Sequence, residues 1–308
     1  MNHLLNKKYM KNYFIISILI FILIEILNNY LILKNSIMYA TKLWINDIFP
    51  TLLPFFIISS LLIAYGFVEI IGNILYPITN KLFNISKSAT FVLFMSLFSG
   101  IPSNAKYIVE LYNKNEIDEK EGTNLLCYTF FSNPLFIIGT LAATFLNSEC
   151  LAPIILFSHY IPNIIIGIYL KKHNTNYNNN ISKRISNPNF GKVVTNSIMN
   201  AINTLLLILG VISFFSILTT IITNKFNINS TFVSSIFEIT QGLNNIKDLN
   251  ISLKLKTILS TMVLSFGGLS SHMQIYSIIS ETNIKYKPFL ISRIVHSLLS
   301  GLFIYLLF

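Results

Sequence analysis

The stretch that decides how this chain folds reads Ser99-Gly100-Ile101-Pro102-Ser103-Asn104-Ala105-Lys106. It follows an apolar run over residues 88–99 and precedes an amphipathic run over residues 106–113. A helix of about twelve residues rises about 18 Å, whereas the hydrocarbon core of a bilayer is about 30 Å thick. A helix that stopped here would expose unpaired backbone groups at membrane depth, which is tolerated only where protein buries them or a wet cavity receives them. The alternative is a proline kink in an ordinary spanning helix.

The composition indicates a membrane protein. Of the 308 residues, 53% are hydrophobic and 11% are charged, against about 25% charged in a typical soluble domain. We therefore expect a multi-pass protein of the cell membrane whose main partner is the lipid bilayer. Basic residues in short loops orient spanning helices, and they explain the net charge of +10 without a nucleic-acid partner. Cys127 and Cys150 lack metal-ligand spacing, so the sequence predicts no metal site and no cofactor.

The N-terminal part predicts a retained spanning helix. Three lysines precede an apolar run over residues 14–33, which favours a cytoplasmic N-terminus. Glu25 lies inside this run, where a carboxylate either faces a partner in the bundle, or is protonated or snorkels. A second helix begins over residues 47–54, and residues 70–83 suggest an interfacial or buried segment. Residues 110–121 hold five acidic residues and predict a solvated turn.

Three further interruptions fall in apolar sequence. The segment Ser132-Asn133-Pro134 divides the apolar residues between 125 and 146. The other two interruptions are Glu238–Gly242 and Gly267–Gln274. Together with Gly100–Lys106, they give four places where a helix is expected to break.

The distribution of basic residues predicts how the halves are oriented. Residues 171–192 are rich in Lys and Asn and contain no acid, which predicts a cytoplasmic linker. If residues 88–113 crossed the membrane fully, this linker would face outside, whereas a re-entrant hairpin over 88–113 returns it to the cytoplasm. The same reasoning makes residues 230–248 a hairpin from the opposite side.

The predicted fold class is all-α: a polytopic membrane protein built as an inverted repeat of helices with re-entrant hairpins and broken helices. Its parts are an N-terminal transmembrane helix with a connector (residues 1–46), a first repeat (47–170), the linker (171–192) and a second, inverted repeat (193–308). Inverted repeats with broken helices place a substrate near the membrane midplane, at the interface between the repeats.

At the four breaks the chain resembles a known family. The motifs are Gly100-x-Pro-Ser-x-Ala-Lys106, Ser132-Asn-Pro-Leu-Phe-Ile137 with Gly139, Glu238-x-Thr-x-Gly242, and Phe266-Gly-Gly-Leu-Ser-x-x-x-Gln274. From about residue 47 to the C-terminus the chain is similar to the YlbJ-type sporulation integral membrane proteins. These belong to the wider nucleoside-recognition (Gate) domain family, which is similar in part to concentrative nucleoside transporters. The resemblance implies a membrane location, a transport-like function and a nucleoside-like solute.

The expected substrate-binding residues come from the four breaks: Gly100, Pro102, Ser103, Asn104, Lys106, Ser132, Asn133, Pro134, Glu238, Thr240, Gln241, Gly267, Gly268, Ser270 and Gln274. Free N–H groups at the starts of half-helices attract anionic or polar groups, and side-chain amides both donate and accept hydrogen bonds. Glu238 would bind a hydroxyl or a cation, or carry a proton. The alternatives are helix–helix hydrogen bonds for the amides, a headgroup position for Glu238, a snorkelling Lys106 and a structural role for His272.

We therefore expect a transporter-like protein that binds or moves a polar small solute. A coupling ion, sodium or a proton, and a homo-oligomer are compatible with this interpretation. The alternative is a structural or assembly protein of spore formation that keeps a transporter-like fold. An enzyme is not expected and no catalytic residue is assigned, because Asp47, Asp118 and Asp248 lie near predicted helix ends and form no intramembrane carboxylate pair.

Overall fold

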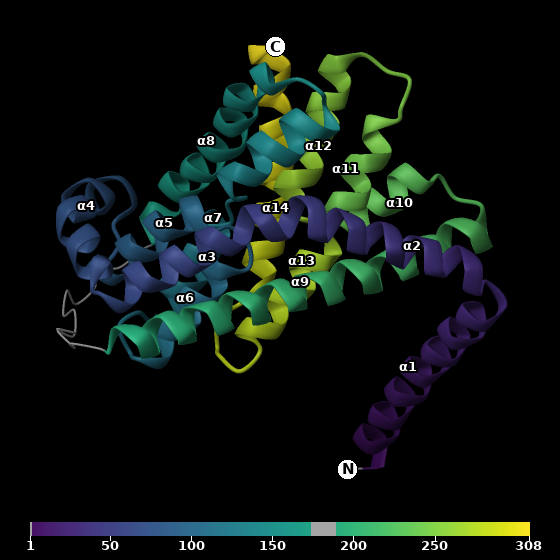
Figure 1. The fold of residues 1–308 in the computed structure, drawn as a ribbon. Helices are drawn as coiled ribbons and strands as arrows, with labels where there is room; N and C mark the ends of the chain where they lie inside the picture. The colour runs from purple at the N-terminus through teal and green to yellow at the C-terminus, as the bar shows by residue number, and fades with distance from the viewer. Residues whose placement is uncertain (1, 174–188) are drawn as a thin grey trace.

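The computed structural model describes residues 2–173 and 189–308, and these residues form helices without strands (Figure 1). The α-helices of the first part are α1 (Asn2–Asn28), α2 (Tyr30–Leu43), α3 (Phe49–Ala64), α4 (Phe67–Phe83), α5 (Lys87–Ser99), α6 (Ser103–Asn113), α7 (Glu119–Tyr128) and α8 (Ala152–Leu170). Those of the second part are α9 (Phe190–Phe226), α10 (Ser230–Phe237), α11 (Ile239–Lys247), α12 (Leu253–Phe266), α13 (Gly268–Ile279) and α14 (Tyr286–Leu307). Two π-helical segments, Trp44–Ile48 and Phe136–Phe145, complete the parts that concern the site.

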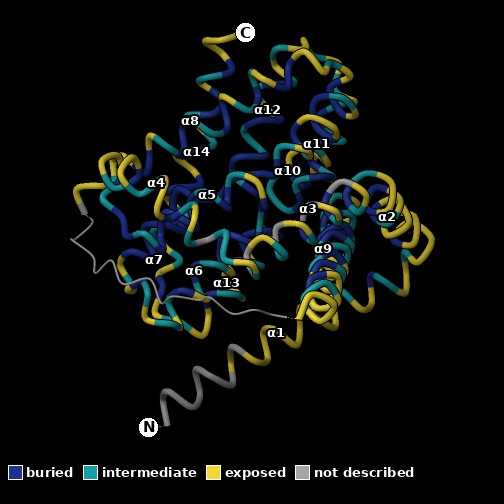
Figure 2. Tube along the Cα trace, turned by 60° about the vertical axis from the view of Figure 1, so that its left-hand side comes forward, coloured by how far each residue is buried: buried dark blue, intermediate teal, exposed yellow. Residues whose placement is uncertain are grey.

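Several helices have the length and apolarity to cross a membrane. By these criteria three of the described helices qualify, at Glu149–Leu170, Phe190–Phe226 and Tyr286–Leu307, or up to five spans if each of two bent pairs crosses as one. Their outer faces carry large exposed apolar side chains, such as Leu206 at 53% and Leu298 at 60% exposure. Figure 2 shows the buried residues gathered in the middle of the molecule and the exposed ones along its outside. The prediction of an all-α polytopic membrane protein is confirmed.

The helix α9 lies along the N-terminal helices. It has 37 residues, which corresponds to about 55 Å of helix, and it packs against α2 and α3 (Figure 1). Ser36 Oγ lies 2.8 Å from Thr220 Oγ1, and Trp44 Nε1 donates to the carbonyl oxygen of Leu205 at 2.9 Å. From Ser36 to Trp44 the contacting residue on α9 moves back from Thr220 to Leu205. Helix α9 therefore runs antiparallel to this N-terminal part of the chain.

Two of the breaks are the tips of helical hairpins. Helix α6 folds back on α5, since the rings of Phe91 and Tyr107 lie 5.6 Å apart and Ser88 Oγ donates to Glu116 Oε2 at 2.9 Å. Helix α11 folds back on α10 in the same way, with Asn245 Nδ2 donating to Ser234 Oγ at 2.9 Å. The kink alternative for residues 99–106 is therefore wrong, because the chain reverses there.

The other two breaks divide helices that continue beyond them. Helix α7 ends at Tyr128, an irregular segment follows, and the π-helical segment begins at Phe136. Helices α12 and α13 are separated at Gly267 alone. Each part of the chain thus holds a hairpin, a broken helix and a final helix in the same order, which is the arrangement on which the predicted repeat depends.

The sequence predicted one spanning helix over residues 14–33, but the structure divides this run between two helices. Helix α1 ends at Asn28, and the part of the chain beyond Asn29 is bent by 97° against it. Glu25, 5% exposed, receives a hydrogen bond from Asn29 Nδ2 at 2.9 Å and pairs with Lys225 Nζ at 2.7 Å. Of the alternatives given for Glu25, the structure therefore shows a carboxylate that pairs with a cationic side chain of α9.

The acidic turn differs from expectation at one residue. Glu121 is fully buried rather than solvated, and its Oε1 accepts a hydrogen bond from the backbone N–H of Ser86 at 2.8 Å. Ser86 is the N-cap of α5 and Glu121 lies in the first turn of α7. The carboxylate joins the starts of these two helices.

Candidate functional site

Residues from all four breaks line one cavity. Its volume is about 110 Å³, and its wall is completed by α3, α9 and the π-helical segment after the second break. The lining residues are Ile48, Leu52, Ser99, Gly100, Ile101, Ser132, Asn133, Phe136, Ile208, Ile212, Glu238, Ile239, Thr240, Leu264, Ser270, Ser271 and Gln274. Seven of the residues predicted from sequence are among them: Gly100, Ser132, Asn133, Glu238, Thr240, Ser270 and Gln274.

Glycines allow the breaks to approach one another in pairs. A Cβ atom on Gly100, where φ is +74°, would lie 3.1 Å from the backbone N of Asn133. A Cβ atom on Gly268, where φ is +62°, would lie 3.3 Å from the backbone N of Ile239. Both positions need a residue without a side chain, because the backbone is left-handed there and a neighbouring backbone is close. The first break thus packs on the second, and the third on the fourth.

Helix α13 presents polar side chains that are free to bind. Ser270, Ser271 and Gln274 occupy one face of its first turns, and all three line the cavity. Among the residues that the structure describes, no hydrogen bond ties these three side chains to the protein. Hydroxyl and amide groups both donate and accept, so this wall of the cavity can bind a polar uncharged partner.

Glu238 provides the one acidic group of the lining. It is 3% exposed and is the N-cap of α11, where its Oε2 accepts from the backbone N–H of Gln241 at 2.8 Å and from Thr240 Oγ1. The start of a helix carries partial positive charge, which stabilises a carboxylate in this position. The helix therefore fixes the orientation of the carboxyl group at the cavity wall.

Asn133 is used by the protein itself. Its Nδ2 donates to the carbonyl oxygen of Phe98 at 2.8 Å, and its Oδ1 accepts from the backbone N–H of Leu135 at 2.8 Å. These bonds satisfy a carbonyl group near the end of α5 and shape the turn after the second break. We assign Asn133 to positioning of the two breaks.

The remaining predicted residues lie around the cavity without lining it. Lys106 is exposed and its Nζ donates to Thr204 Oγ1 on α9 at 2.9 Å. Asn104 is buried, and its Nδ2 donates to Thr129 Oγ1 at 3.5 Å. The amide oxygen of Gln241 is buried without a partner among the described residues. Pro134 lines a separate apolar hollow. Pro102 and Ser103 are buried at the start of α6, and Gly267 lies against the ring of Phe130.

A buried cluster of basic side chains was missed from the sequence. Arg293, His159 and His296 are fully buried between α8 and α14. Arg293 donates to Asn163 Oδ1 and His296 Nδ1, each at 2.9 Å, and to the carbonyl oxygen of Cys127. Its guanidinium carbon lies 4.8 Å from the ring centre of Phe130. The helix spacing was a signal, since 159 and 163, and 293 and 296, each share a helix face within apolar sequence.

Both ring nitrogens of each histidine in this cluster have hydrogen-bond partners. The Nε2 atom of His159 accepts from the backbone N–H of Ser132 at 3.0 Å, so its Nδ1 carries the proton and donates to Ser265 Oγ at 2.8 Å. This assignment follows from the hydrogen-bond network. His272 likewise bonds on both sides, with Tyr286 Oη at 2.8 Å and the carbonyl oxygen of Phe266 at 3.0 Å. His272 does not line the cavity, which fits its structural alternative.

The size of the cavity limits what this conformation holds. Pockets that enclose drug-sized ligands occupy about 300–1,000 Å³, and this one has about 110 Å³. In the described conformation it has space for a few waters or a very small solute. A larger solute requires the hairpins to move apart.

Comparison with known proteins identifies relatives of the chain. Residues 46–171 match the family model Gate, described as nucleoside recognition. The Sporulation integral membrane protein YlbJ of Bacillus subtilis (strain 168) is 29% identical in an alignment 306 positions long that covers 86% of this chain and 75% of the relative. No solved structure matches significantly. The resemblance seen in the sequence motifs is thereby confirmed.

Proposed function

We propose that this protein binds a polar small solute in the cavity between its four helix breaks and moves it across the membrane. The observation that carries the proposal is the free polar face of α13, where Ser270, Ser271 and Gln274 line the cavity without hydrogen bonds to other described residues. The polar atoms of these three side chains are not fully enclosed by protein, and leaving such a group unpaired in a dry site would cost about 1–3 kcal/mol. Such groups are retained where water or a ligand satisfies them.

The chemistry of the lining favours an uncharged solute with hydroxyl or amide groups. Three free polar side chains and one carboxylate share the lining with eight apolar residues and with polar groups such as Ser132 and Asn133, a mixture of apolar and polar groups that small-molecule sites also show. A nucleoside fits this description, and the match to the nucleoside-recognition family supports it. Because the cavity is small, binding of a nucleoside would be coupled to opening of the hairpins, as alternating access requires.

A thermal unfolding screen tests the proposal. The purified protein would be heated in detergent with nucleosides, nucleobases or amino acids, with and without sodium and at two pH values. A solute at a hundred times its dissociation constant should add about 2.7 kcal/mol to the free energy of unfolding. In Gln274→Leu we expect the dissociation constant to rise about tenfold, since one buried hydrogen bond is lost.

The matched control is Ser277→Ala, an exposed residue one turn beyond Gln274 on the same helix that does not line the cavity. It should bind the solute as the wild type does. A solute that stabilises the wild type and Gln274→Leu equally would place binding elsewhere. If no compound stabilises a protein that unfolds cooperatively, the structural alternative is favoured.

A role in spore formation is proposed from the name of the relative alone. A Bacillus subtilis strain that lacks the relative would be complemented with this chain, and spores would be counted. Under the transport proposal the wild type restores sporulation and Gln274→Leu restores it less. If both restore it equally, the protein acts in assembly rather than through the cavity.

The inverted orientation of the two parts needs a separate measurement. We propose that the hairpin tips enter from opposite sides, so that the bases of the hairpins, near Lys114 and Lys247, face opposite compartments. Single cysteines at these positions would be labelled from either side in a Cys150→Ser background, because Cys150 is exposed and Cys127 is buried. Labelling of both from one side would contradict the inverted repeat.

A further inference from the structure

An apolar groove lies on the outside of the bundle, where the end of α8 meets the start of α14. Its volume is about 950 Å³, at the upper end for pockets that hold small molecules. Its floor includes the buried residues Cys127 and Ser292. Its walls include Tyr169 on α8, which is 65% exposed, and Ile291 and Val295 on α14, which are 53% and 41% exposed.

Charge is confined to one end of this groove. Among its lining residues only Lys285 and Lys287 are charged, and both lie at the start of α14. Lys172 is placed at the same end, since its Nζ lies 4.3 Å from the ring centre of Tyr169. The rest of the lining is apolar except for Asn124, Ser292 and the thiol and phenol groups.

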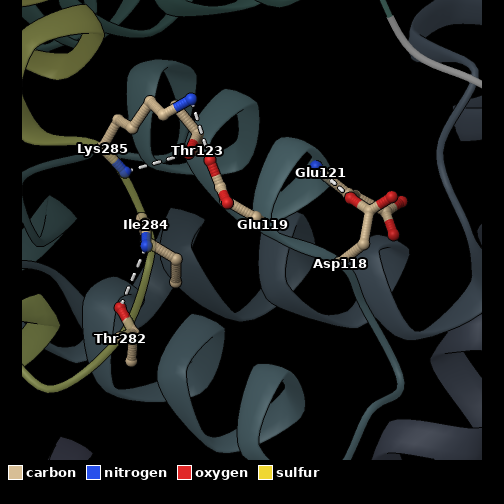
Figure 3. A network of polar contacts seen from close by, with 7 residues as sticks. All are labelled: Asp118, Glu119, Glu121, Thr123, Thr282, Ile284 and Lys285. Atoms are coloured by element: carbon tan, nitrogen blue, oxygen red, sulfur yellow. Dashed lines mark hydrogen bonds and ion pairs between the residues drawn. The ribbon is translucent and has the colours of Figure 1, made fainter.

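The protein holds one of these lysines in place. Lys285 Nζ pairs with Glu119 at 2.9 Å, and its backbone N–H donates to Thr123 Oγ1 at 3.1 Å (Figure 3). Its side chain remains 69% exposed, and an ammonium has three donors, so a second acceptor can be bound. No ion pair to Lys287 is found among the described residues.

The length of the groove matches one leaflet. On α14 the lining residues run from Tyr286 to Leu299, a rise of about 20 Å. Half of a hydrocarbon core is about 15 Å deep. A single acyl chain can therefore lie along α14 while its headgroup remains at the lysines.

We propose that this groove is a binding site for an anionic phospholipid. One acyl chain occupies the apolar groove between α8 and α14, and the phosphate group binds Lys287 and Lys285. Basic pockets between spanning helices on the cytoplasmic side recognise anionic headgroups in this way. The site is independent of the central cavity, with which it shares no lining residue.

Native mass spectrometry of the full chain in detergent tests the proposal. The probes are phosphatidylglycerol and phosphatidylcholine with identical acyl chains. We expect tighter binding of phosphatidylglycerol, and a loss of about fivefold in its affinity in Lys287→Gln, since one lysine near a headgroup is worth that factor. Val295→Trp fills the groove and should weaken binding of both lipids at least tenfold.

Two controls separate the groove from the general lipid surface. Lys254→Gln removes a lysine that lies over Tyr305, near the other end of α14, and Ile294→Trp enlarges an exposed residue beside the groove that does not line it. Both should bind phosphatidylglycerol as the wild type does. Equal affinity for the two lipids, wild-type binding in Val295→Trp, or equal losses in Val295→Trp and Ile294→Trp would overturn the proposal. Unfolding temperatures recorded for each variant would distinguish lost binding from lost folding.

Discussion

Two polar regions of this molecule meet at Ser132 and differ in how many of their side chains the protein itself hydrogen-bonds. On the cavity side, the side chains of Ser270, Ser271 and Gln274 have no hydrogen-bond partner among the described residues. On the other side, the backbone N–H of Ser132 donates to His159, which belongs to the cluster of Arg293, His159 and His296. All three side chains of this cluster are hydrogen-bonded, and of their polar atoms only Nε of Arg293 lacks a partner among the described residues.

This difference separates a candidate site from a scaffold. A cationic side chain inside a membrane protein is by default a candidate functional group. Arg293, however, is fully buried, and its hydrogen bonds go to carbonyl oxygens and neutral side chains of the protein. The cavity residues are chemically less conspicuous, but they are the ones available to a solute. Whether a buried polar group has a partner is therefore more informative here than its charge.

The largest expected effect is in the scaffold. Arg293→Met would leave Asn163, His296 and the carbonyl group of Cys127 without a donor. Each unpaired buried group costs about 1–3 kcal/mol, and relief from burying a charge offsets part of this, so we expect unfolding to require about 3 kcal/mol less. Thermal unfolding in detergent would measure it. If Arg293→Met kept its stability but lost solute binding, the basic cluster rather than the cavity would be the binding site.

The next effect concerns the hairpin that carries Glu238. A Cβ atom on Gly242 would lie 2.7 Å from Cα of Ser235, so Gly242→Ala forces α10 and α11 apart at a cost of about 1–3 kcal/mol. Gly210→Ala on α9 is the control, because nothing lies within 4 Å of its Cβ position and alanine favours a helix by up to about 1 kcal/mol. The two variants should shift the unfolding temperature in opposite directions. Equal shifts would mean that close packing of this hairpin is unimportant.

Glu238 should show a mixed response, because it is bonded to the protein and also lines the cavity. Glu238→Gln keeps the shape but weakens the cap on α11, for which we expect a loss of about 1 kcal/mol in stability. Solute binding should weaken in addition. Comparison with Asp118→Asn, which changes the cap of α7 at a residue that does not line the cavity, isolates the second effect. If both variants bind the solute equally, the Glu238 carboxylate is only a cap.

Local sequence was sufficient to predict the breaks and their meeting. The segment around Gly100 and Pro102 could not continue a spanning helix, and the basic linker required residues 88–113 to fold back. Both arguments use neighbours in the chain or a charge rule. The same local view could not tell which polar groups of a break face the cavity, so Gln274 and Asn104 were weighted alike although only Gln274 lines it.

What was missed depends on residues far apart in the chain. Arg293 meets Asn163 across 130 positions and Cys127 across 166, and no periodicity in either segment specifies that contact. The partner of Glu25 on α9 and the burial of Glu121 against Ser86 have the same origin. Tertiary packing decided these cases, and a single charged residue in apolar sequence indicated only that some partner must exist.

The smallest expected effect tests a residue that the sequence placed in the site. Lys106 is exposed and contacts Thr204 on α9 rather than the cavity. An exposed hydrogen bond of this kind contributes little, so Lys106→Gln should change the free energy of unfolding by less than about 0.5 kcal/mol and leave solute binding unchanged. Thermal unfolding of Lys106→Gln and Gln274→Leu, recorded without solute and at increasing solute concentrations, would measure both the stability and the affinity. A loss of binding in Lys106→Gln as large as in Gln274→Leu would show that the bound state brings Lys106 inward, and that α6 moves against α9 when the cavity opens.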